Sequence, residues 1–359
     1  QKKLPLYACF YAVCLWIGVV SCGFSAEFNT FTNTAGQGPR GIASSDFNGD
    51  GFPDIITANN LADTLSIYTN NGTGIMISNS LLAAISSPVN LATADVNSDG
   101  RTDVIVVNNG SASLMVLTNG GLTGLSSNAT LSVGSFPVFV AGGNLSGGGK
   151  PDLVCANTGG SGSLTILTNN GSGKFAFHTT LFPGGKPSSV AIADFNGDGK
   201  NDLAAANYDT DTVVIFTNQG GATYISNATW SVASDPTFVL AVDLNGDNRP
   251  DLITANFNSS VLTVFTNNNT GVFGYNASIA ISGSPYSLAA ADFNNDGIND
   301  LAAAVSAFRA EVNDPVSGAD GLIIVLDHED RVAKVTQALE RGQQPIVVAR
   351  MQANARFIE

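Results

Sequence analysis

The stretch DFNGDGFPD (residues 46–54) places aspartate or asparagine at its first, third, fifth and ninth positions, with glycines between them. Four further copies, DVNSDGRTD, DFNGDGKND, DLNGDNRPD and DFNNDGIND, begin at Asp95, Asp194, Asp243 and Asp292, and a degenerate copy, NLSGGGKPD, begins at Asn144. Consecutive copies start 49, 49, 50, 49 and 49 residues apart. Similarity at a fixed period of this length indicates a repeat architecture, so one repeat unit predicts the fold.

One unit, residues 187–232, contains four extended segments joined by short polar turns. An apolar run (SVAIA) precedes the acidic stretch, DLAAAN follows it, TVVIFT comes next, and a fourth segment ends the unit. Four strands of about six residues with their turns need about 48 residues, which matches the period. The sequence therefore predicts an all-β chain in which each repeat is a four-stranded antiparallel blade of a β-propeller. Six repeats are visible, which allows six or seven blades.

Small residues crowd the run before each acidic stretch, as in GIASS, LATA and VAGG. Innermost propeller strands converge on a narrow axis, where small side chains fit, so this pattern favours a closed ring over an open solenoid. Two further series recur in phase through the first five repeats: an Asn five residues after the last Asp of the loop, and a Thr-Asn pair that closes the third strand; in the sixth repeat Val305 replaces the Asn and no Thr-Asn pair follows. We interpret both series as structural turn residues.

The acidic stretches are predicted Ca²⁺-binding hairpin loops. Ca²⁺ takes six to eight oxygen ligands, and alternate side chains of a curled loop, together with the carbonyl of position 7, could supply them. Glycine at position 6 permits the sharp bend. The alternative is an Asx-rich turn that binds no ion. The expected ligands at about five sites are Asp46, Asn48, Asp50, Phe52 and Asp54; Asp95, Asn97, Asp99, Arg101 and Asp103; Asp194, Asn196, Asp198, Lys200 and Asp202; Asp243, Asn245, Asp247, Arg249 and Asp251; and Asp292, Asn294, Asp296, Ile298 and Asp300.

The degenerate loop keeps Asp152 as its single carboxylate, with Ser146 and Gly148 at inner positions, and we expect it to be empty or weak. The five intact loops hold 15 of the 29 acidic residues of a chain whose net charge is −14. Acidity concentrated in this way indicates ligand supply, and the negative charge argues against nucleic acid as a partner.

These loops resemble the FG-GAP/VCBS repeat family, whose calcium loops follow the pattern D-x-[DN]-x-D-G-x-x-D, over about residues 30–305. The resemblance implies a β-propeller with calcium ions in the hairpin loops of successive blades. It also implies a secreted or surface protein engaged in adhesion or carbohydrate binding. The FG and GAP signatures themselves are poorly kept, so the chain looks more like the bacterial VCBS-type branch than an integrin α subunit.

The first 26 residues are expected to be a secretory signal, because Lys2 and Lys3 precede an uncharged run that ends at Ala26. Two alternatives remain open. The run is long enough to be an uncleaved membrane anchor, and VVSC at residues 19–22 resembles a lipoprotein box that would lipidate Cys22 and anchor the chain in an outer membrane. We therefore expect a secreted or cell-surface protein with its propeller at residues 27–307.

The sixth repeat departs from the pattern after residue 307, and charged residues become frequent. Residues 308–359 are interpreted as an appended or foreign α/β segment. The alternative is a divergent last blade in which residues 322–326 serve as third strand. Residues 28–34 could supply an outer strand to that blade.

No catalytic set is evident, and the repetition of the aspartates argues for a structural role, so we do not expect an enzyme. The predicted function is an extracellular binding or adhesion module for a glycan or a protein. The alternatives are a lyase-like enzyme acting on polysaccharide and a passive spacer in a surface protein. Loop aromatics Phe52, Tyr208 and Phe257 are candidate contacts, Cys155 is expected to be a buried apolar residue, and the sequence does not specify an oligomeric state.

Overall fold

The computed structural model describes residues 35–70, 72, 76–82, 85–121, 124–268, 271–281, 283–291, 299–306 and 321–326. These residues form antiparallel sheets of consecutive strands, which we number as blades 1 to 6. None of them belongs to a helix that could span a bilayer.

Blades 1 to 3 have four strands each. Blade 1 contains β1 (Pro39–Ser45), β2 (Asp54–Asn59), β3 (Thr64–Asn70) and β4 (Met76–Leu82). Blade 2 contains β5 (Pro88–Ala94), β6 (Asp103–Asn108), β7 (Ser113–Asn119) and β8 (Leu125–Ser132). Blade 3 contains β9 (Pro137–Gly143), β10 (Asp152–Asn157), β11 (Ser163–Asn169) and β12 (Phe175–Leu181).

Blades 4 and 5 repeat this pattern, and blade 6 has three strands among the described residues. Blade 4 contains β13 (Pro187–Ala193), β14 (Asp202–Asn207), β15 (Thr212–Asn218) and β16 (Tyr224–Ser231). Blade 5 contains β17 (Pro236–Val242), β18 (Asp251–Asn256), β19 (Val261–Asn267) and β20 (Phe273–Ala280). Blade 6 contains β21 (Ser284–Ala291), β22 (Asp300–Ser306) and β23 (Gly321–Leu326).

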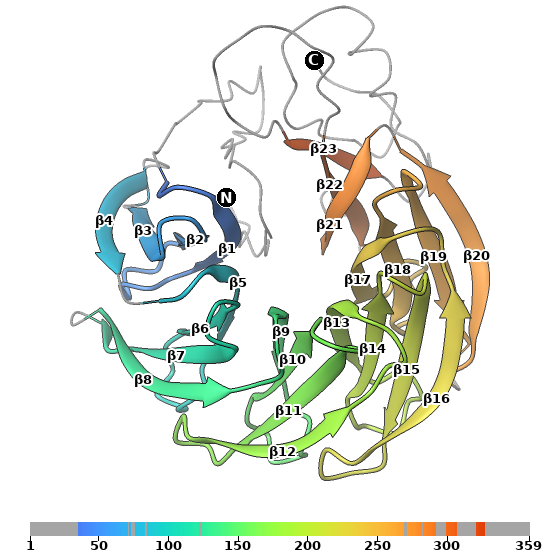
Figure 1. Ribbon diagram of the computed structural model, residues 1–359, viewed down its shortest axis with the longest axis horizontal. Helices are drawn as coiled ribbons and strands as arrows, with labels where there is room; N and C mark the ends of the chain where they lie inside the picture. The colour runs from blue at the N-terminus through green and yellow to red at the C-terminus, as the bar shows by residue number, and fades with distance from the viewer. Residues whose placement is uncertain are drawn as a thin grey trace, which may run out of the picture.

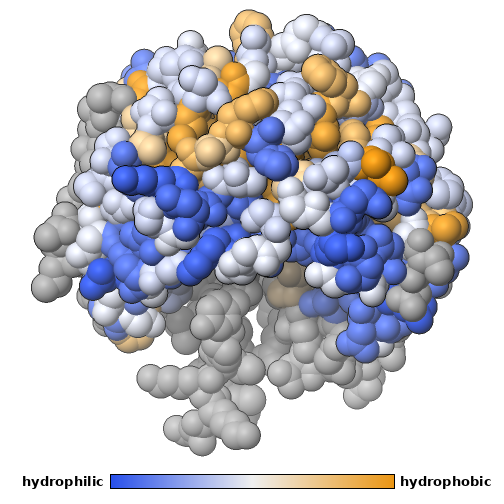
Figure 2. All heavy atoms as spheres, turned by 90° about the horizontal axis from the view of Figure 1, so that it is seen from below, coloured by the Kyte–Doolittle hydropathy of each residue, from blue (hydrophilic) through white to orange (hydrophobic). Residues whose placement is uncertain are grey.

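The blades are arranged around a common axis, with the first strand of each blade innermost and the fourth strand outermost (Figure 1). This confirms the predicted all-β propeller of four-stranded antiparallel blades. Figure 2 views the outer surface from below Figure 1, where polar residues form a broad band and apolar residues gather toward one rim.

Antiparallel order gives each blade two distinct ends. The connection between its first and second strands lies at the end that we call the loop face, and the connection between its second and third strands lies at the opposite end, the turn face. Every acidic stretch joins a first strand to a second strand, so those that the structure describes in full, at residues 46–54, 95–103, 144–152, 194–202 and 243–251, lie on the loop face. This arrangement follows from the constant period of the sequence.

The core lies between neighbouring sheets. Second strands are buried along their whole length in blades 1 to 5, which explains their apolar runs such as DVIVVN and DLITAN. Side chains of β2 and β3, including Ile56 and Ile67, pack against Leu91 and Val104 of blade 2. Equivalent clusters join blades 2 and 3 and blades 4 and 5.

The innermost strands approach closely, as the small residues of their runs predicted. At Gly41 of β1, an added Cβ would lie 2.9 Å from the Cα of Asn90 in β5. That distance is too short for a side chain, so glycine is required by the close approach of the two backbones.

Strand β23 pairs with β22 in antiparallel register, with Ala303 opposite Ile324. It therefore occupies the place that the divergent-blade alternative gives to residues 322–326. The expected strand at residues 28–34, the expected signal at residues 1–26, and residues 308–320 and 327–359 lie outside the described residues.

Candidate metal centre

The acidic loops occupy corresponding positions on the loop face of the blades. We number them after their blades and number positions 1 to 9 within each. They are loop 1 (46–54), loop 2 (95–103), loop 3 (144–152), loop 4 (194–202), loop 5 (243–251) and loop 6 (292–300).

Loop 4 illustrates how the backbone wraps around the first aspartate. The carboxylate of Asp194 accepts hydrogen bonds from the amides of Gly197 (2.8 Å), Asp198 (3.1 Å) and Gly199 (2.7 Å). The side-chain oxygen of Asn196 accepts a second bond from Asp198 N, and Asp198 in turn accepts one from Lys200 N. Alternate polar side chains therefore shape the loop through local backbone bonds.

The same bonds recur in the other intact loops that the structure describes. In loop 1, the amide of Gly51 lies 2.8 Å from Asp46 Oδ2, and in loop 5 the amide of Asn248 lies 2.7 Å from Asp243 Oδ2. Loop 2 has the corresponding bond from Gly100 to Asp95 at 2.9 Å. The four loops thus share one backbone conformation.

Two positions of the loop need a left-handed backbone. Position 6 has positive φ in every described loop, as expected from its glycines, and Asn248 adopts the same conformation with φ of 62°. Position 4 is also left-handed, with φ of 80° at Gly49 and 62° at Ser98. The left-handed position 4 was not predicted from the sequence, although glycine occupies it in four of the six copies.

The ninth aspartate has a distinct role. In loop 4, Asp202 is fully buried; its Oδ2 accepts the amide of Phe195 (3.2 Å) and its Oδ1 accepts the amide of Asn218 (2.7 Å). Asp54, Asp103 and Asp251 are equally buried and make the equivalent two bonds. The ninth carboxylate therefore ties its loop to the end of the third strand.

Burial raises the pKa of the ninth carboxylate in loops 1, 2, 4 and 5, while its two backbone hydrogen bonds lower it. The carboxylates at positions 5 and 1 of the same loop raise this pKa further. Three negative groups thus lie close enough to repel one another, and a cation among them would relieve that repulsion.

The asparagine of each Thr-Asn pair completes this arrangement. Besides donating its backbone amide to the ninth aspartate, Asn218 donates from Nδ2 to the carbonyls of Asn201 in its own loop (3.0 Å) and of Leu145 in loop 3 (2.8 Å). Asn169 and Asn267 make the equivalent bonds to loops 2 and 4. The expected turn residue is therefore also a link between neighbouring loops.

In three loops the residue at position 7 is a lysine or an arginine, and its charged side-chain group lies near the aspartate at position 5. Lys200 Nζ lies 2.9 Å from Asp198 Oδ2, while Arg101 and Arg249 lie 3.6 Å and 3.9 Å from Asp99 and Asp247. The hydrogen bond from Lys200 is the main reason that the pKa of Asp198 is lowered. Loop 1 has Phe52 at this position and no such cation.

The donor set of the intact loops suits Ca²⁺. Positions 1, 3, 5 and 7 offer two carboxylates, an amide oxygen and a carbonyl, all of them hard oxygen ligands. Within the described ranges, no three His, Cys, Asp or Glu side chains are gathered as a metal-binding group. The ninth carboxylate is turned to backbone amides, although each of its oxygens keeps a further acceptor site, so its role as a ligand stays a prediction.

Three further predictions concern the sixth loop, the loop aromatics and Cys155. Positions 1 to 7 of loop 6, Asp292 to Ile298, lie outside the described residues; Asp300 begins β22, and its side chain is likewise not described. Phe257 packs edge-on against Tyr286, with ring centroids 6.5 Å apart. Cys155 is fully buried in β10, as expected.

Models of known protein families match most of this chain. The FG-GAP-like repeat model matches residues 46–106, 95–155, 144–205, 194–254 and 243–303, and the FG-GAP repeat model matches residues 284–326. The chain belongs to the FG-GAP repeat family. The last match includes β23, and this membership, with the propeller fold, indicates a protein-binding or structural module.

Solved structures share the fold of these FG-GAP repeats at low identity. BBS1N in complex with ARL6DN is 14% identical with a TM-score of 0.54, over 76% of this chain and 77% of that chain. A functionally unknown protein from Desulfotomaculum acetoxidans is 13% identical with a TM-score of 0.55, over 82% and 90%. A protein from Bacteroides uniformis described as a "putative 6-phosphogluconolactonase" is 16% identical with a TM-score of 0.54, over 68% and 71%.

At these identities the likeness concerns the fold alone, and the FG-GAP assignment does not decide whether the chain is an enzyme. No curated protein matches the chain.

Proposed function

We propose that this protein is an extracellular, calcium-binding β-propeller that acts as a binding or adhesion module for a glycan or a protein ligand. The observation that carries the proposal is the loop face. There, four described loops repeat one amide-wrapped conformation, with aspartates at positions 1 and 5 and an asparagine at position 3.

In each intact loop, Ca²⁺ would be held by the side chains at positions 1, 3 and 5 and the carbonyl at position 7, with position 9 as a further candidate. A bound ion offsets the repulsion among carboxylates that raises the pKa of the ninth aspartate. It would also stiffen the loops of neighbouring blades, which suits a surface that presents a fixed shape to a partner.

The extracellular setting is supported by the N-terminal sequence. Calcium sites of modest affinity would fill at extracellular calcium concentrations. A passive spacer would bind calcium equally well, so ligand binding is what separates the two functions. A lyase-like enzyme remains distinguishable by activity on a polysaccharide panel.

The test is calorimetric titration of the full chain with Ca²⁺, paired with melting curves in calcium and in EDTA. We expect about five sites and a large fall of the melting temperature in EDTA. A matched titration with Mg²⁺ controls for general screening of the acidic loops. Absence of calcium binding with an unchanged melting curve would overturn the proposal.

A further inference from the structure

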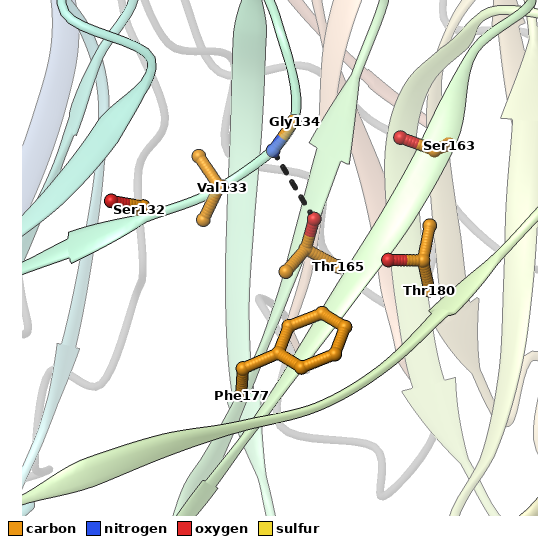
Figure 3. Close-up of a pocket in the computed structure, with 7 residues that line it drawn as sticks. All are labelled: Ser132, Val133, Gly134, Ser163, Thr165, Phe177 and Thr180. Atoms are coloured by element: carbon orange, nitrogen blue, oxygen red, sulfur yellow. Dashed lines mark hydrogen bonds between the residues drawn. The ribbon is translucent and has the colours of Figure 1, made fainter.

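A hollow of about 270 Å³ lies at the junction of blades 2 and 3, near the turn face. One side is the segment that follows β8, including Gly134, and the other consists of side chains from β11 and β12 (Figure 3). Its volume is near the lower limit of ligand pockets, which run from about 300 Å³. It therefore suits a small unit such as one sugar ring.

The polar groups of this hollow are uncharged hydroxyls with protons to donate. Thr165 Oγ1 already accepts hydrogen bonds from Asn157 Nδ2 (3.0 Å) and Gly134 N (3.3 Å), and Ser163 Oγ accepts one from Asn157 Nδ2 (3.3 Å). The O–H group of Ser163 thus remains as a donor to a ligand, whereas Thr165, only 3% exposed, lines the hollow with little accessible surface. Within the described part of the chain, the Thr180 hydroxyl has no protein partner, and Figure 3 shows it pointing to the same side as that of Ser163.

An exposed aromatic ring borders these hydroxyls. Phe177 is 65% exposed and lies across the hollow below Thr165 in Figure 3. The face of an aromatic ring carries partial negative charge, so it attracts the polarised C–H groups on the flat face of a sugar ring. An aromatic ring face beside hydroxyl donors suits a sugar, which has C–H groups on the face of its ring and hydroxyl groups at its edge.

Blade 3 combines these features in a way that the other described four-stranded blades do not. By strand register, the counterparts of Phe177 are Ser78, Ser127, Ser226 and Tyr275. Only blade 5 has an aromatic there, and Val261 replaces Ser163 at the first position of its third strand.

We propose that the hollow formed by Ser163, Thr165, Phe177 and Thr180 is a subsite for one neutral sugar residue of a glycan. The proposal rests on the glycan-binding form of the function above and names where that ligand is held. The lining carries no charged side chain among the described residues, so neutral sugars are preferred to sialylated or sulfated ones.

The experiment applies the full chain, in calcium, to an array of neutral, sialylated and sulfated oligosaccharides. The tightest neutral oligosaccharide is then titrated into the wild type and into F177A, T180V and Y275A. Phe177 and Thr180 face the hollow from a surface strand, so the melting curves of F177A and T180V are expected to match that of the wild type. Tyr275, 62% exposed at the counterpart position, is the matched control.

We expect F177A to weaken binding by about tenfold or more, the effect of losing an aromatic stacking partner. T180V should weaken binding by about three- to tenfold, as for one lost hydrogen bond. Y275A should leave the affinity within about twofold of the wild type, because Tyr275 lies in another blade and is independent of the hollow.

Neutral-glycan binding that survives F177A would overturn the subsite but leave the proposed function standing, because the glycan then binds elsewhere. Binding of charged glycans alone would also overturn it. Failure to bind any glycan, with calcium still bound, would overturn both the subsite and the glycan form of the proposed function, leaving a protein ligand or a spacer.

Discussion

Loop 4 and loop 3 have the same backbone frame but different ligand positions. Both keep a fully buried aspartate at position 9, Asp202 and Asp152, each bonded to the loop and to the end of its third strand. Both have left-handed glycines at positions 4 and 6. Loop 4 adds Asp194, Asn196 and Asp198, whereas loop 3 has Asn144, Ser146 and Gly148 at those positions.

Within one motif, some residues shape the loop and others are available as metal ligands. Position 9 and the left-handed residues shape the loop, and they persist where the carboxylates at positions 1 and 5 are gone. The carboxylates of positions 1 and 5 also accept amides of their own loop, but the loop persists without them, so they are the groups that an ion would use. The sequence of loop 3 therefore shows which residues the fold itself requires.

The largest expected effect comes from removing the ninth aspartate. D152A and D202A should each lower the free energy of unfolding by about 3 kcal/mol or more, since each buried amide left without an acceptor costs about 1–3 kcal/mol. The measurement is urea denaturation in EDTA, where no ion contributes. The conservative variants D152N and D202N keep one acceptor and should lose less; an unaffected D152A would contradict the structural role.

Next in size is the conversion of loop 3 into a calcium loop. N144D, S146N and G148D together should add one site to the calorimetric stoichiometry, because the backbone frame is already present. An added Cβ at Gly148 would meet only Ser146 Oγ, at 3.6 Å, and its φ is not left-handed, so the aspartate fits. At calcium a hundredfold above Kd, one added site stabilises the fold by about 2.7 kcal/mol.

The reciprocal control removes the site from loop 4. D194N with D198N should subtract one site while leaving stability in EDTA nearly unchanged. If the triple variant of loop 3 folds but adds no site, then oxygen ligands on this frame do not suffice for calcium.

A smaller effect concerns the cations at position 7. Replacing Arg101, Lys200 and Arg249 by Met together should tighten the mean calcium affinity of their loops by about twofold, in keeping with the weakness of exposed ion pairs. Calorimetric titration measures the shift. The control is K150M, because Lys150 Nζ bonds to Ser98 Oγ of loop 2 (2.6 Å) and not to a carboxylate of its own loop; an equal shift in K150M would mean a general charge effect.

The smallest expected effect is none. Burial raises the pKa of the Cys155 thiol far above its usual value, so its labelling by a thiol reagent at pH 8 should be slow. The labelling rate is measured by mass spectrometry of the Cys155 peptide, and rapid labelling of the folded chain would contradict the burial of this side chain.

The repeat period and the alternation within one unit were enough to predict the blades. Six loops in phase placed every first-to-second strand connection, and apolar runs such as DLAAAN identified the strand that follows each loop. These features are local in sequence, so a single unit contains them. The third strand of blade 6 lies beyond the break at residue 307, where phase no longer helps, and the sequence left its assignment open.

The site was predicted less completely, because hydrogen bonds between distant residues carry part of it. The motif predicts Asp202 as a metal ligand. Its hydrogen-bond partner, the backbone amide of Asn218, lies 16 residues away, so the motif gives no sign of this bond. The hollow beside Phe177 joins two blades, and nothing in a single repeat reveals it. The left-handed position 4 was missed as well, although the glycines at this position are a local sign of it.

The bonds between loops also follow the order in which the blades are synthesised. On the loop face, Asn169, Asn218, Asn267 and Asn299 each donate to the loop of the blade synthesised just before. A ribosome adding roughly 5–20 residues per second needs about 2–10 seconds for one repeat, whereas a hairpin closes in about 1–10 microseconds. Each blade can therefore fold and dock on its predecessor before the next blade has been synthesised.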